Sequence, residues 1–157
     1  MHFLKGLLGL TSTRPPPPNW SIVRAINEDR QEAAVIRIRT DKPSDFARLG
    51  TAIEISWPYE SDTPFPKTRD NEQMLEFERA LDELAGENGY SELVRVSTGN
   101  GVKAWLFYSS NQLRFMDRMN SLLKSHAVYP IEIKFYEDSG WQIWSETATA
   151  LESRGGG

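Results

Sequence analysis

The chain has 157 residues, of which 39% are hydrophobic and 25% are charged, and a domain of this size buries roughly two-thirds of its unfolded surface. These values exclude a fully disordered chain and a fibrous repeat, and they predict one domain with a hydrophobic core. With 22 acidic and 18 basic side chains the net charge is -4, which disfavours a nucleic acid as the partner. The chain contains no cysteine, which excludes disulfides, thiolate metal sites and cysteine nucleophiles.

The N-terminal residues contain an apolar run, but Lys5 and two glycines interrupt it and no cleavage pattern of small residues follows. This disfavours a secretory signal. Nothing later approaches the roughly 20 consecutive apolar residues that a membrane-spanning helix needs. We therefore expect a cytoplasmic protein without membrane contact.

Proline and glycine clusters predict the domain limits. The prolines from Pro15 to Pro18 predict a polyproline II spacer, which together with the preceding residues forms a tail of residues 1–18. A single domain is expected over residues 19–150. Residues 151–157 end in glycines and predict a flexible tail.

The domain opens with β-rich segments. Residues 20–26 and 33–39 flank a polar turn at residues 27–30, which predicts a hairpin. A third strand is predicted over residues 52–57, because large apolar side chains alternate there with small or polar ones, and Pro58 ends it.

An amphipathic helix is predicted to begin at Asp70, an N-cap candidate, and to end by Gly86. Its apolar residues recur at helical spacing, at Met74, Phe77, Leu81 and Leu84. Its acidic residues are expected on the opposite, solvated face: Glu72, Glu76, Glu78, Asp82 and Glu83.

Residues 93–98 and 102–109 predict two strands joined by a tight turn at Gly99-Asn100-Gly101, because an Asn-Gly pair tolerates positive φ values. A second helix follows Ser110 or Asn111, with an apolar stripe from Phe115 to Leu123. A last strand, 131–137, alternates apolar with charged residues.

From residue 48 to residue 137, the predicted elements run strand, helix, strand, strand, helix, strand. This order predicts an α+β fold, namely a ferredoxin-like βαββαβ sandwich. Two helices should cover one face of the sheet, and the hairpin of residues 20–39 should extend it.

Several strand cores resemble a known family. They are Glu54-Ile55-Ser56-Trp57-Pro58-Tyr59, Gly101-Val102-Lys103-Ala104-Trp105-Leu106-Phe107-Tyr108-Ser109 and Pro130-Ile131-Glu132-Ile133, followed by Asp138 and Trp141. Together they resemble the bacterial domain-of-unknown-function family six-nine-five (DUF695). That family is similar in its second half to the regulator of ribonuclease E activity B proteins, which have a ferredoxin-like fold and bind an enzyme rather than catalyse a reaction. The resemblance implies a fold and a bacterial origin, and it transfers no catalytic residue.

The residues themselves give no catalytic, cofactor or metal motif. His2 and His126 are the only histidines, and a metal site usually needs more nitrogen or thiolate ligands. Carboxylate pairs such as Glu137 with Asp138 are interpreted as solvated turn residues. The chain lacks a nucleophile elbow, a phosphate-binding loop and a dinucleotide fingerprint. We therefore expect a protein that is not an enzyme and that uses no cofactor.

One strand carries the sharpest candidate surface, because Lys103, Trp105 and Phe107 share one of its faces. We favour packing of this face over a partner-binding role. Residues 141–144 or another chain would then cover the two aromatic rings. RNA stacking is a third alternative, which the net charge opposes.

The acidic helix face is the second candidate surface, although such faces are more often simply solvated. The candidate partner-binding residues are Arg95, Lys103, Trp105, Phe107, Glu72, Glu76, Asp82 and Glu83.

The leading hypothesis is a non-catalytic interaction or regulatory domain that binds another protein. One alternative is an immunity-type inhibitor whose acidic helix occupies the basic site of a toxin. Another is a hydrolase or other enzyme that uses charged residues converging on the open sheet face, namely Glu54, Arg95, Lys103 and Glu132. RNA binding is the last alternative. The sequence does not indicate the oligomeric state.

Overall fold

The computed structural model describes residues 19–155, so the predicted spacer and the tail of residues 1–18 lie outside the described residues. The strands are β1 (Trp20–Ile26), β2 (Glu32–Arg39), β3 (Thr51–Pro58), β4 (Ser91–Gly99), β5 (Val102–Ser109) and β6 (Glu132–Glu137). The helices are α2 (Thr68–Ala80), α3 (Gln112–Leu123) and α4 (Gln142–Gly155), with two 3₁₀ turns, η1 (Phe46–Arg48) and η2 (Asp82–Ala85).

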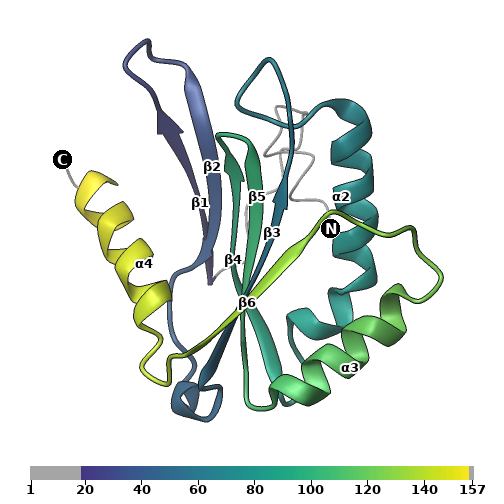
Figure 1. The fold of residues 1–157 in the computed structure, drawn as a ribbon. Coiled ribbons are helices and arrows are strands. Elements are labelled where there is room, and N and C mark those ends of the chain that lie inside the picture. The colour runs from purple at the N-terminus through teal and green to yellow at the C-terminus, as the bar shows by residue number, and fades with distance from the viewer. Residues whose placement is uncertain (1–18, 156–157) are drawn as a thin grey trace.

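The described strands form one antiparallel sheet in the order β1-β2-β4-β5-β3-β6 (Figure 1). The predicted α+β class is therefore confirmed, and the hairpin of β1 and β2 extends the sheet beyond β4. The turn between β4 and β5 has the predicted geometry, because Asn100 and Gly101 have φ values of 53° and 85°. This turn sets the register in which Val96 of β4 lies opposite Trp105 of β5.

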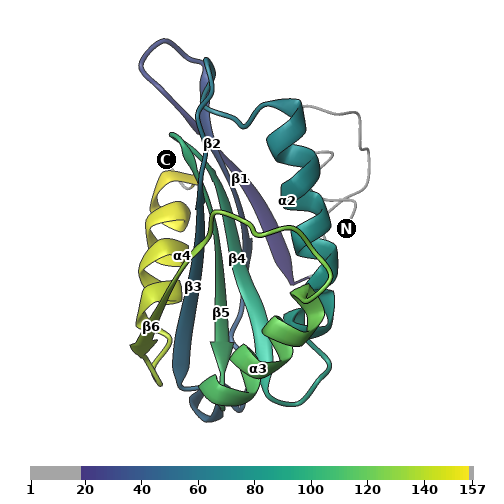
Figure 2. The same cartoon turned by 45° about the vertical axis from the view of Figure 1, so that its right-hand side comes forward.

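Helices α2 and α3 cover one face of the sheet, and α4 covers part of the other (Figures 1 and 2). The domain thus has three layers. Only the first helical layer was predicted, because the residues after β6 show no clear amphipathic period in the sequence. Helix α4 continues to Gly155, so part of the predicted C-terminal tail is helical.

The main core lies between the sheet and the first helical layer. It contains side chains from β3, β4 and β5 and the apolar stripes of α2 and α3: Ile53, Ile55, Trp57, Met74, Phe77, Leu81, Leu84, Leu93, Val96, Trp105, Phe107, Phe115 and Met119. Burial of each large side chain stabilises the fold by ~1.5–3 kcal/mol. The apolar stripe predicted for the first helix is confirmed, because its four residues all lie in this core.

A second core lies between the sheet and α4. The rings of Tyr108 and Trp141 stack there with their centroids 4.3 Å apart, and Trp141 donates its indole N–H to the carbonyl of Leu49 at 2.9 Å. Asp138 directly follows β6 and caps α4, because its carboxylate accepts hydrogen bonds from the backbone N–H groups of Gln142 and Ile143 at 2.8 and 2.9 Å.

The same carboxylate accepts a hydrogen bond from the Tyr108 hydroxyl at 2.6 Å. Burial, reinforced by this hydrogen bond to Asp138, raises the pKa of Tyr108 well above its ordinary value. Asp138 and Trp141, two residues of the family resemblance, therefore attach α4 to the sheet.

Among the described residues, no helix has the length and apolar character needed to cross a bilayer.

Candidate functional site

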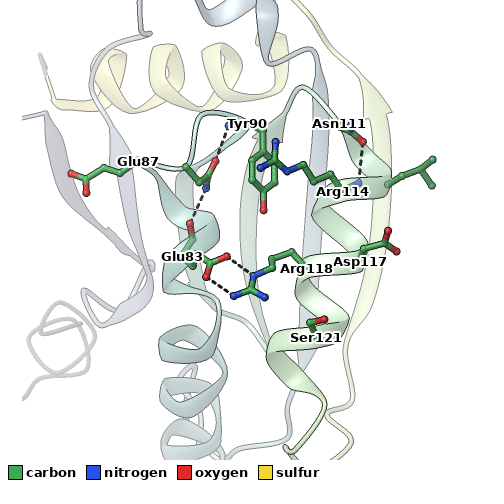
Figure 3. A pocket seen from close by; sticks show the side chains of 10 residues that line it. Glu83, Glu87, Tyr90, Asn111, Arg114, Asp117, Arg118 and Ser121 are labelled. Atoms are coloured by element: carbon green, nitrogen blue, oxygen red, sulfur yellow. Dashed lines mark hydrogen bonds and ion pairs between the residues drawn. The ribbon is translucent and has the colours of Figure 1, made fainter.

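An open depression of about 820 Å³ lies where the connection from η2 to β4 meets the N-terminal half of α3 (Figure 3). Its walls carry charged and polar side chains, which include Glu83, Tyr90, Asn111, Arg114, Asp117 and Arg118.

An ion pair joins the two walls of the depression. Nε and Nη2 of Arg118 on α3 lie 2.5 and 2.7 Å from the two carboxylate oxygens of Glu83 on η2, and Figure 3 shows the groups facing each other. The hydrogen bonds from Arg118 lower the pKa of Glu83, and those to Glu83 raise the pKa of Arg118. Both side chains remain almost half exposed, so the pair orients the guanidinium group while solvent still reaches it.

Arg114 is held by an aromatic ring. Its guanidinium carbon lies 4.0 Å from the ring centroid of Tyr90, which is a close cation–π contact (Figure 3). The start of α3 is also fixed, because the Asn111 side chain accepts a hydrogen bond from the backbone N–H of Arg114 at 3.0 Å. The adjoining loop is ordered by Asn88, whose Oδ1 accepts hydrogen bonds from the backbone of Tyr90 and Ser91.

The acidic residues that were predicted to form one surface lie in different places. Glu72 and Glu76 on α2 and Asp82 on η2 are exposed, and of the four acidic candidates only Glu83 lines the depression. Glu78 is the exception to the predicted solvated face. Its side chain is 3% exposed, so the expectation that it points to solvent is wrong.

Glu78 points toward the sheet because it has buried partners there. One carboxylate oxygen, Oε1, lies 2.9 Å from Nη2 of Arg37 and accepts a hydrogen bond from the indole N–H of Trp105 at 2.8 Å. The ion pair with Arg37 on β2 therefore offsets the desolvation cost of burying the Glu78 carboxylate.

Lys103 lies beneath α2 and is 0% exposed. Its Nζ has no hydrogen-bond partner among the described residues and lies 5.3 Å from the ring centroid of Trp105. Burial lowers the pKa of Lys103 to about 7, although the charge of Glu78 opposes the shift.

Trp105 and Phe107 are 1% and 2% exposed and belong to the main core. Their burial contradicts the two alternatives in which these rings line a partner-binding or an RNA-stacking surface, because a buried ring cannot stack on a base. Packing inside the chain was the favoured interpretation, but α2 and α3 cover the two rings rather than residues 141–144.

Arg95 and Glu54 lie on the opposite face of the sheet from Lys103. Nη2 of Arg95 is 3.2 Å from Oε2 of Glu54, and Nη1 donates a hydrogen bond to Oγ1 of Thr147 on α4 at 2.7 Å. Burial is the main reason that the pKa of Arg95 is lowered. Glu132 is exposed on β6. The four residues of the enzyme alternative therefore do not converge on one face.

Among the described residues, no three histidine, aspartate or glutamate side chains are grouped in a way that could hold a metal ion.

Residues 18–147 match the family model described as a family of unknown function, DUF695. The chain belongs to this family. No curated protein matches the chain. The predicted membership in DUF695 is confirmed, and the matched range contains every described strand together with the depression.

The depression was not predicted from the sequence, although Glu83 was. Arg114 and Arg118 have the spacing of two residues on one exposed face of a helix, which is the signal that could have indicated them. Their partners Tyr90 and Glu83 come from another part of the chain, so the pairing depends on the tertiary structure.

Proposed function

We propose that this DUF695 domain is a non-catalytic protein-interaction domain that binds its partner at the depression beside α3. The observation that carries the proposal is the pair of oriented, solvent-accessible guanidinium groups of Arg114 and Arg118, one held by Tyr90 and the other by Glu83. Arginine and tyrosine are enriched among the residues that dominate binding energy at protein interfaces.

Leu113 supports the same proposal. It lines the depression and is 77% exposed. An exposed leucine flanked by oriented arginines suits a partner segment that carries carboxylates and an apolar side chain.

The distribution of the other charged groups also favours binding over catalysis. Lys103 and Glu78 are in the core, and Arg95 is held by Glu54 and Thr147 on the other face. A catalytic pair of such groups would have to meet at one solvent-accessible point.

We also propose a ferredoxin-like fold for part of the domain. The order β6-β3-β5-β4, with α2 and α3 on one face, supports a ferredoxin-like arrangement within residues 48–137. It also supports the likeness to the regulator of ribonuclease E activity B proteins, and with it a regulatory role in the bacterial cytoplasm.

Affinity capture from cells that naturally contain the protein tests the proposal. We expect the wild-type chain to retain a partner in stoichiometric amount and Arg114→Glu to lose it. Lys67→Glu makes the same charge change at an exposed residue outside the depression and should retain the partner. Equal retention by both variants, or no stoichiometric partner for the wild-type chain, would contradict the proposal.

A further inference from the structure

Strand β6 ends the described sheet, where β3 is its hydrogen-bonded neighbour. The outer edge of such a strand presents backbone N–H and C=O groups that can pair with another strand. We propose that two copies of this chain join at this edge, with their β6 strands antiparallel and with Ile133 of one copy opposite Ile133 of the other.

The charges beside Ile133 are self-complementary in this register. Glu132 and Lys134 lie on one face of β6, because they are opposite Ser56 and Glu54 of β3 in the regular antiparallel pairing. Both are exposed, and neither has an ion-pair partner among the described residues. When the two Ile133 residues are opposite, Glu132 of each copy is opposite Lys134 of the other. Two favourable cross-strand ion pairs result.

The neighbouring symmetric registers lose this match. Centring the pairing on Lys134 places the two lysines opposite each other, and centring it on Glu132 does the same with the two glutamates. Centring it on Phe135 places Glu137 opposite Ile133. Like charges directly opposite each other destabilise a strand pair, and the register centred on Phe135 places Lys134 opposite Tyr136, so it forms no ion pair between Glu132 and Lys134. The charge order therefore selects the register centred on Ile133.

Apolar groups on the other face of β6 support the same register. Ile133 and Phe135 lie on that face, and Phe135 is 36% exposed. A groove of about 390 Å³ opens beside them, with Leu123, Val128 and Ile131 among its lining residues. In the proposed register, Phe135 of the second copy lies opposite Ile131, at the rim of this groove. Fully exposed Val128 lies in the same lining, so the contact would bury apolar surface on both copies.

The proposed pairing forms a closed assembly. A twofold axis through the two Ile133 residues joins two six-stranded sheets and uses both β6 edges, which leaves no free β6 edge for a third copy. The contact does not involve Arg114 or the depression, so it is independent of the proposed partner-binding site.

Sedimentation velocity over a concentration series tests the pairing with charge variants. We expect a concentration-dependent dimer of the wild-type chain. Glu132→Lys and Lys134→Glu should each raise the dimer Kd by about tenfold or more, because each change converts two attractive pairs into two repulsive ones. An equimolar mixture of the two variants should form a heterodimer, and the double variant with both changes should dimerise like the wild type.

Lys67→Glu is the control, because it reverses an exposed charge outside both β6 and the depression, and it should dimerise like the wild type. Circular dichroism of each variant should match the wild type, since both substituted side chains are exposed. A wild-type chain that stays monomeric, single variants that dimerise as well as the wild type, or a mixture that stays monomeric would each overturn the proposal. Recovery in the mixture and in the double variant would support it.

Discussion

Trp105 donates its indole N–H to Oε1 of Glu78 at 2.8 Å, beneath α2 and away from solvent. The same oxygen pairs with Arg37. A residue expected on the solvated side of a helix is therefore the acceptor for two buried donors, which makes it important for stability.

Replacing Glu78 by alanine should destabilise the fold by about 3–5 kcal/mol, because it breaks the buried ion pair with Arg37 and removes the acceptor of the Trp105 indole N–H. Urea unfolding followed by tryptophan fluorescence measures this change. Glu76→Ala, at an exposed position of the same helix, should change the free energy of unfolding by less than about 0.5 kcal/mol. Similar values for the two variants would show that Glu78 is not a buried partner.

Lys103 should make stability rise with pH above neutrality. Its pKa in the folded protein is about 7 and its ordinary value is 10.5, so between these values the unfolded chain binds a proton that the folded chain lacks. The free energy of unfolding therefore increases with pH by up to about 1.4 kcal/mol per pH unit in this window. Below this window, the folded chain carries the full cost of a buried ammonium group, which the charge of Glu78 offsets in part and the charge of Arg37 increases.

This prediction is measured as the difference between wild type and Lys103→Met in urea unfolding at pH 7, 8 and 9. The difference should shift in favour of the wild type as the pH rises. Lys67→Met removes an exposed lysine and should show no such trend. A pH-independent difference for Lys103→Met would mean that Lys103 has the same pKa in both states.

Replacing Asp138 by alanine should loosen α4, because two backbone N–H groups lose their cap and the Tyr108 hydroxyl loses its acceptor. We expect a loss of about 2–3 kcal/mol and faster amide exchange in the first turn of α4. In a Tyr108→Phe background the same substitution should cost less, since the two residues share one hydrogen bond. Equal costs in both backgrounds would show that the hydrogen bond contributes nothing.

Truncation of the central ring, Trp105→Ala, should cost about 3–5 kcal/mol and unfold much of the protein at physiological temperature. Thermal denaturation followed by circular dichroism measures this loss. Val102→Ala, at an exposed position of the same strand, is the matched control. A folded Trp105→Ala variant with near-normal stability would contradict the burial described above.

Local patterns account for most of the predicted elements. Alternation along 102–109 correctly put Lys103, Trp105 and Phe107 on one side of a strand, and the Asn100-Gly101 pair correctly indicated the turn. Helix α4 was missed because its attachment to the sheet depends on Tyr108 and Leu49, which are distant from it in the sequence.

The sequence by itself determined the α+β class and the two helical stripes, because alternation, helical spacing and turn residues act within a few positions of the chain. The resemblance of its strand cores to DUF695 also lies in the sequence, and the family match confirms it. Only the tertiary structure decided that Glu78 faces Arg37, that Lys103 and Arg95 are on opposite faces, and that Arg114 meets Tyr90. Each of these relationships involves residues from separate elements. Their energies depend on burial and on the partner charge, which no local pattern contains.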